Sequence, residues 1–220
     1  MLDWLKGKIA SNRLHPLHET LFGDVPLAQW AGNAATEPWR SFDHAAASID
    51  RQDRGAAIQA FEGILTQSDL ESRHYLQAWT SLRQLGIQAP GSQAKHLYGI
   101  VLDLPVSGGL DTLAAYEDRG ARYFNFSGKA VIWDRPNPSL DGEIEGLLAA
   151  SRELLGKIGP WEGVRPPLPH GLARISLLTP SGLHFGEAAP ALLFRDPMAA
   201  PVLQAATRLM QALIARTSTA

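Results

Sequence analysis

The chain has 220 residues, enough for one large domain or for a modest domain with a smaller helical one, and in either case for a sizeable core. Its 20 lysines and arginines against 22 acidic residues give a formal net charge of -2, so no overall field draws it to nucleic acid or to an anionic membrane. It has no cysteine, which excludes a thiol nucleophile, a Cys-ligated metal and a disulfide framework.

Residues 1–36 predict an amphipathic N-terminal segment followed by an irregular wrap. The segment has helical spacing in Leu2, Leu5 and Ile9, which favours docking on the body of the protein, with membrane-surface anchoring as the alternative. Lysines interrupt the apolar run that a signal peptide requires, and no stretch of about 18 apolar residues follows. We therefore expect a cytoplasmic, bacterial-type protein with no membrane span and no nucleic-acid partner.

Residues 37–90 predict a small α-helical subdomain, because apolar residues recur there at three and four positions. Ser68 and Glu71 have the spacing of a capping box that opens its third helix, and Gly86 can close that helix. Ala57 and Phe61 resemble the second-helix positions of a tetratricopeptide-type repeat. The resemblance covers one unit at most, and a solenoid needs about three, so a helical hairpin packed on its neighbour is the preferred interpretation.

Residues 91–220 predict an α+β domain that begins after the turn-prone residues 89–92. Short strands are expected near 96–104, 110–116, 121–126 and 130–133, joined by turns in which Gly120 and Gly128 supply left-handed conformations. A further strand group begins near 174–178.

Two long amphipathic helices are expected in the same domain, near 139–157 and 201–215. The predicted fold class is thus α+β: an antiparallel β-meander sheet with two long helices on one face, preceded by a small α-helical N-terminal subdomain. In residues 121–126, Phe124 and Tyr123 point to opposite sides, so both faces are partly apolar. We expect the second face to be covered, by the N-terminal helices or by another subunit.

One loop resembles the phosphate-binding SGG-x-D-[S/T] loop of the N-type ATP pyrophosphatases, a family that adenylates its substrates. The matching residues are Ser107, Gly108, Gly109, Asp111 and Thr112. The resemblance implies an ATP-using enzyme, in which glycines let backbone amides approach the pyrophosphate and a following helix lends its positive end. The alternative is a hairpin turn, because the interval before the next predicted strand is too short for a crossover.

Histidines and carboxylates supply weaker candidates. His15 and His18 are metal-competent, although Pro16 keeps them from sharing a regular helix. An acid/base pair could be assembled across the sheet from His170, His184, Glu187, Asp103 and Asp111. The spacing does not require either site, and no residue is assigned a catalytic role.

Aromatic residues of the strands are the remaining candidates. They are core residues or, in the alternative, anchors of a protein interface: Tyr123, Phe124, Phe126, Trp133 and Trp161. The leading hypothesis is a non-catalytic binding or regulatory module that acts through protein contacts, with a protein partner or a homodimer and without a cofactor. The alternative is the ATP-using enzyme. A strand at 110–116 would favour the hairpin turn, whereas a helix there would favour the phosphate-binding loop.

Overall fold

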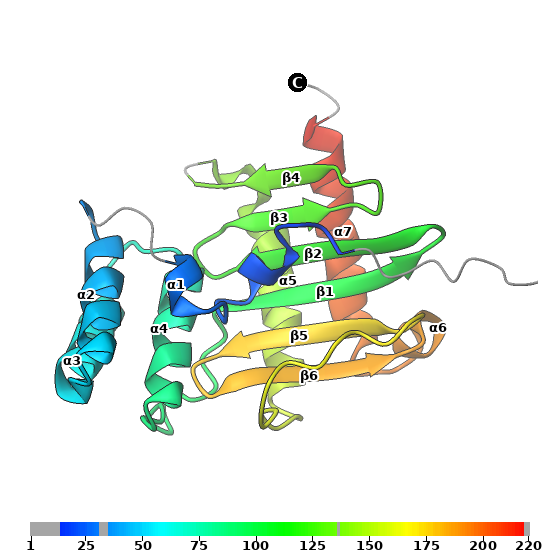
Figure 1. Ribbon diagram of the computed structural model, residues 1–220. Coiled ribbons are helices and arrows are strands. Elements are labelled where there is room, and N and C mark those ends of the chain that lie inside the picture. The colour runs from blue at the N-terminus through cyan, green and yellow to red at the C-terminus, as the bar shows by residue number, and fades with distance from the viewer. Residues whose placement is uncertain (1–13, 31–34, 136, 218–220) are drawn as a thin grey trace, which may run out of the picture.

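The computed structural model describes residues 14–30, 35–135 and 137–217, and it contains one antiparallel sheet of six strands (Figure 1). The strand order is β4-β3-β2-β1-β5-β6, and each neighbouring pair is antiparallel. The strands are β1 (Gly99–Val106), β2 (Gly109–Tyr116), β3 (Ala121–Phe124), β4 (Ala130–Trp133), β5 (Ala173–Thr179) and β6 (Gly182–Ala188). The predicted mixed helix and strand fold with an antiparallel sheet is therefore confirmed.

Helices precede, interrupt and follow the strands. They are α1 (Leu27–Trp30), α2 (Trp39–Asp50), α3 (Arg54–Leu65), α4 (Ser72–Gln84), α5 (Asp141–Leu155), α6 (Pro190–Leu193) and α7 (Ala200–Thr217), with 3-10 turns η1 (His18–Leu21) and η2 (Pro138–Leu140). The two long helices expected from periodicity are α5 and α7. The amphipathic segment expected at Leu2, Leu5 and Ile9 lies outside the described residues.

The largest core lies between the sheet and the helices α5 and α7, which run behind the strands in Figure 1. Alternate side chains of β1, β2, β3 and β5 point into it, and the helices supply Leu147, Leu154, Leu209 and Leu213, which are at most 8% exposed. Burial of four such side chains contributes to stability by removing apolar area from water.

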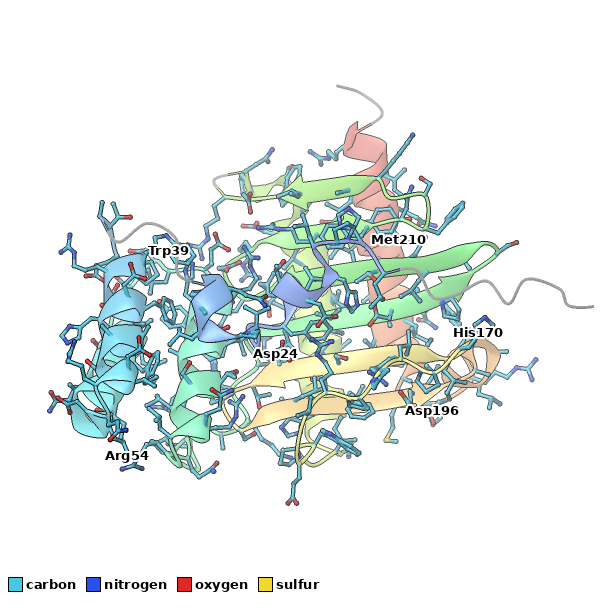
Figure 2. All side chains as sticks on the ribbon, viewed as in Figure 1. Asp24, Trp39, Arg54, His170, Asp196 and Met210 are labelled. Carbon is cyan, nitrogen blue, oxygen red and sulfur yellow. The ribbon has the colours of Figure 1, made fainter. Side chains whose placement is uncertain are left out.

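The opposite face of the sheet is covered by residues 14–30 and by α4. Leu21, Phe22 and Leu76 pack there against the other set of alternating strand residues, which includes Val101 and Phe124. In Figure 2, Asp24 lies in front of the sheet while α7 runs behind it. Of the N-terminal helices that were expected to cover this face, α4 does so through Leu76, and the segment before α1, expected as an irregular wrap, supplies Leu21 and Phe22.

A third apolar cluster holds α2, α3 and α4 together around Phe42, Phe61 and Trp79. The predicted capping box is wrong in its position: α4 begins one turn later than expected. Glu71 is its N-cap, accepting from the His74 N–H while His74 Nδ1 accepts from the Glu71 N–H at 3.2 Å. The division into 1–36, 37–90 and 91–220 stays a prediction.

Left-handed backbone is found at one of the two predicted turn glycines. Gly128 has φ 86, and Gly86, just beyond α4, has φ 78. In the turn between β2 and β3, however, Arg119 has φ 70 in place of Gly120. Asp118 accepts the Gly120 N–H at 2.8 Å, so the turn is closed by a side chain as well as by backbone.

Candidate functional site

The SGG loop is a two-residue hairpin turn between β1 and β2. Val106 pairs with Gly109, which leaves Ser107 and Gly108 at the tip, and Gly108 takes φ 100. Residues 109–116 are strand, so the loop has no helix after it whose N-terminus could face a phosphate. The geometry that the pyrophosphatase resemblance implies is therefore not formed at this loop.

The two polar residues at the end of the motif point to opposite faces of the sheet. Asp111 accepts the Tyr123 hydroxyl and the Phe126 N–H, each at 2.8 Å. Thr112 is buried on the other face and donates to Asp103 at 2.7 Å. Strand alternation separates them, so they do not converge on one ligand.

Three of the five aromatic candidates are buried or partly buried in the apolar clusters and are not available to a protein partner. Tyr123 and Phe124 are 7% and 2% exposed, on opposite faces. Trp133 is partly buried against the α5 and α7 core. The exposed pair, Phe126 and Trp161, belongs to loops near different strands and is 50% and 47% exposed.

The histidine pair does not form a metal site. His15 stacks on the Phe124 ring with centroids 4.2 Å apart, whereas His18 turns to Asp103. Within the described ranges, no three His, Cys, Asp or Glu side chains could jointly hold a metal ion.

The second histidine group is also dispersed. His184 is fully buried, and its ring lies 3.1 Å from the Ser181 hydroxyl and 3.3 Å from the Ile158 carbonyl. Burial lowers the pKa of His184. Glu187 bonds Arg174 at 2.6 Å, and His170 lies in the exposed loop before β5 (Figure 2). No acid/base pair is formed among them.

A buried polar cluster at the centre of the sheet was missed by the sequence analysis. His18 Nε2 lies 2.9 Å from Asp103 Oδ1, and the same oxygen accepts from Thr112, with each of the three residues at most 3% exposed. The signal in the sequence is Asp103 itself, a charge inside the apolar strand GIVLDLPV. Its histidine partner is 85 positions away and could not be identified from local pattern.

The neighbours of His18 decide the direction in which its pKa is shifted. Burial lowers the pKa of His18, but hydrogen bonds and charge from Asp103 and Glu19 outweigh burial, and the pKa is raised above its usual value. Arg165 extends the cluster outward, since it bonds Glu19 and Asp24 and lies 3.7 Å from the centroid of the Phe22 ring. The cluster thus fastens residues 14–30 to the sheet.

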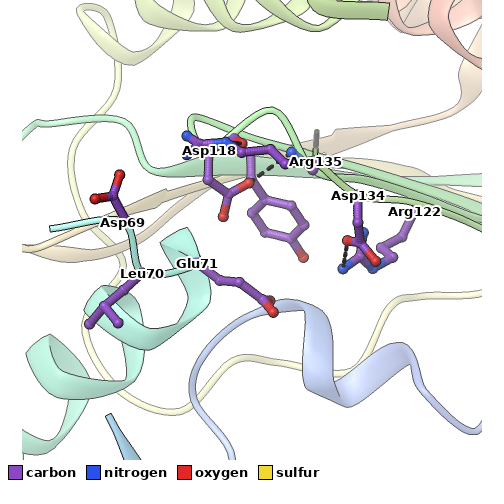
Figure 3. Close-up of a pocket in the computed structure, with 9 residues that line it drawn as sticks. Asp69, Leu70, Glu71, Asp118, Arg122, Asp134 and Arg135 are labelled. Atoms are coloured by element: carbon purple, nitrogen blue, oxygen red, sulfur yellow. Dashed lines mark hydrogen bonds and ion pairs between the residues drawn. The ribbon is translucent and has the colours of Figure 1, made fainter. Parts of the chain in front are cut away.

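A pocket of about 340 Å³ opens where α4 meets the turns of the sheet (Figure 3). Its charged lining is Asp69, Glu71, Asp118, Asp134, Arg122 and Arg135, four carboxylates against two guanidinium groups. Most of these groups are paired within the protein. Asp118 accepts the Ser72 N–H at 2.5 Å, Arg122 bonds Asp134 at 2.7 Å, and Arg135 donates to the Asp118 carbonyl. The pocket therefore lies between the helical part and the sheet, and the hydrogen bond between Asp118 and Ser72 at its wall connects the two.

Beside this pocket, β4 is an edge strand, with no further strand beyond it among the described residues. Antiparallel ladders alternate between residues that bond the neighbour and residues that do not. The Asn125 N–H bonds the Lys129 carbonyl, so Val131 and Trp133 also face β3, while Ala130 and Ile132 direct their N–H and C=O groups away from it. The Ile132 side chain is 53% exposed.

A scan against protein-family models, a search of curated proteins and a search of solved structures each found no match to this chain. None of the helices within residues 14–30, 35–135 and 137–217 is long and apolar enough to cross a bilayer.

Proposed function

We propose that the protein is a non-catalytic binding module that acts through protein contacts, and that the outward side of β4 is its contact surface. We call this surface, residues 129–134, the β4 edge. The observation that supports it is an apolar strand, AVIW, whose outward backbone groups at Ala130 and Ile132 bond to no other strand of the described chain.

Edge strands of this kind recruit other chains. An added strand gains backbone hydrogen bonds along the edge, and exposed side chains of the edge supply the apolar contact. Natural monomers block such edges with proline, lysine or inward charges; residues 130–133 contain none of these, and Lys129 lies just before the strand. The β4 edge is short, so the contact needs side-chain packing as well as hydrogen bonds.

The opposite edge of the sheet is partly occupied. On β6, the Leu183 carbonyl accepts the Trp161 N–H at 2.6 Å, and the Trp161 ring packs on Phe185 with centroids 5.1 Å apart. Trp161 therefore uses one of the outward backbone groups of β6, and its ring covers part of that edge. This difference favours β4 over β6 as the contact surface.

Photo-crosslinking in cells tests the proposal. A benzophenone amino acid is placed at Ile132 and, as a matched control, at Ile49, an isoleucine of α2 that is 41% exposed. We expect protein adducts at position 132 that are several times more abundant than those at position 49. Equal yields at the two positions, or no protein adduct at 132, would contradict the proposed function.

A further inference from the structure

We propose that the occupant of the β4 edge is a second copy of this chain, paired through β4 about a two-fold axis. This inference rests on the proposed function and names its partner. The two sheets of six strands would then form one continuous sheet of twelve.

The register of this pairing is set by the outward backbone groups. A two-fold axis at Val131 places Ala130 opposite the partner's Ile132, and Ile132 opposite the partner's Ala130. All four of these residues have outward N–H and C=O groups. Antiparallel pairs that face each other in this way exchange two hydrogen bonds each, so the two pairs supply about four. A shift by one residue would instead place a residue with outward N–H and C=O groups opposite a partner residue whose groups face β3, so that pair could not exchange hydrogen bonds.

The side chains of the same register are complementary in size. On the face of the sheet that carries Arg122, the small Ala130 lies next to the partner's exposed Ile132. On the face that carries α7, the two copies of Val131 lie side by side. Trp133 lies opposite the partner's Lys129 in this register.

The charges at the two ends of β4 favour the antiparallel direction. Lys129 precedes the strand and Asp134 follows it, and both are exposed. Antiparallel pairing brings Lys129 of each copy toward the partner's Asp134, whereas parallel pairing would place like charges together. Each Asp134 also keeps its internal bond to Arg122 at 2.7 Å.

Sedimentation velocity on the full chain tests for the dimer. We expect the parent protein to be a dimer at micromolar concentrations. Ile132→Pro removes an N–H that faces away from β3, so the fold should survive and the dimer dissociation constant should rise at least tenfold. Ile132→Asp should act similarly, and Ile49→Asp, which removes another exposed isoleucine, should leave the dimer unchanged. A monomeric parent protein would overturn the inference.

Disulfide trapping tests the register. The chain has no cysteine, so Val131→Cys supplies one thiol per copy, and the two thiols would meet across a non-hydrogen-bonded pair, where Cα atoms lie about 4.5 Å apart. We expect Val131→Cys to form a disulfide-linked dimer under mild oxidation and Ile49→Cys to stay reduced.

The outcomes separate this inference from the proposed function. A dimer that Val131→Cys does not trap, or that Ile132→Pro leaves intact, would use another surface and overturn the inference. A monomer that still crosslinks a different protein at position 132 would overturn the inference and support the proposed function. No adduct at 132 of any kind would contradict both.

Discussion

Asp103 and His18 show how one buried charge in a strand is accommodated. An ionised carboxylate without partners would be too costly at the middle of a sheet, and here the Thr112 hydroxyl and the His18 ring satisfy it. The same contacts hold residues 14–30 in place over the strands. The cluster therefore links burial of a charge to attachment of the N-terminal segment.

Substitution of His18 should destabilise the fold in a pH-dependent way. His18→Ala leaves Asp103 buried without its cationic partner, and we expect a loss of about 3 to 5 kcal/mol in the free energy of unfolding. The pKa of His18 is raised by folding, so its contribution is complete below the unfolded pKa of about 6.5 and is lost as the pH rises through the folded value. Urea unfolding of the parent and of His18→Ala across pH 5 to 9 measures this difference. A constant difference at every pH would contradict it.

The SGG turn gives a second prediction at this scale. Gly108 has φ 100, so Gly108→Ala should cost about 1 kcal/mol or more, whereas a Cβ at Gly109 would meet the Phe126 Cβ at 3.0 Å. We expect titration calorimetry of the parent with millimolar ATP to show no saturable binding. Saturable binding that Gly109→Ala abolishes, in a protein that remains folded, would support the ATP-using enzyme instead.

Residue-level prediction from the sequence succeeded where the cause was local. Gly86 and Gly128 adopt left-handed backbone as their turn positions predict, and Tyr123 and Phe124 alternate as strand residues must. It failed at the turn before β3, where a neighbouring residue takes the left-handed conformation, and at Asp103, where a distant group decides. Gly120 does not need positive φ because Asp118 and Arg119 close that turn, and Asp103 gains its meaning only from His18, which the fold brings beside it.

At the scale of elements, α7 is the longest helix of the described chain and seals the core behind the sheet. Its stripe was evident from periodicity because Val202, Leu203, Leu209 and Leu213 repeat at helical spacing. The position of the α4 cap was not, since the Ser68 and Glu71 spacing predicts a start at Ser68, whereas Glu71 is the N-cap and pairs with His74.

Truncation in α7 or α5 should measure this core. Leu209→Ala and Leu147→Ala each remove a side chain that is at most 1% exposed, and we expect losses of about 2 to 5 kcal/mol. Leu192→Ala, at a position 62% exposed in α6, is the control and should cost much less. Equal urea midpoints at unchanged slope for Leu209→Ala and the parent would show that the core assignment is wrong.

The β4 strand allows a direct test of its backbone orientation. Val131→Pro removes an N–H that bonds β3, whereas Ile132→Pro removes one that faces outward. In the presence of enough denaturant to dissociate any dimer, Val131→Pro should lower stability by about 1 kcal/mol or more beyond Ile132→Pro. Equal losses would mean that the alternation along β4 is the reverse.

At the scale of the whole molecule, the helices α2 and α3 are joined to the sheet through α4. Besides the packing of Leu76, three contacts tie α4 to the sheet and its turns: Ser72 with Asp118, Arg83 with the Pro180 carbonyl at 2.7 Å, and Tyr75 stacked on Tyr98. The helical part is therefore a candidate for opening as a unit while the strands stay paired.

Hydrogen exchange tests this hierarchy. Amides of α2 and α3 should exchange through an opening of lower free energy than amides of β1 and β5. Asp118→Ala removes the acceptor of the Ser72 N–H, and we expect about tenfold faster exchange in α4 with little change in β5. Glu37→Ala, an exposed change in the same half of the chain, is the control. Uniform exchange across all elements would contradict the proposed hierarchy.

The central place of β1 also affects how the chain folds during synthesis. One side of β1 pairs with β2, which follows it at once, but the other pairs with β5, with Gly99 opposite Leu178. At typical rates of translation, roughly 3 to 15 seconds separate the synthesis of these two strands. Throughout that time the inner edge of β1 has no strand beside it and can pair wrongly. Closure of the sheet by β5 is therefore the step at which ribosome-bound chaperones would protect this protein most.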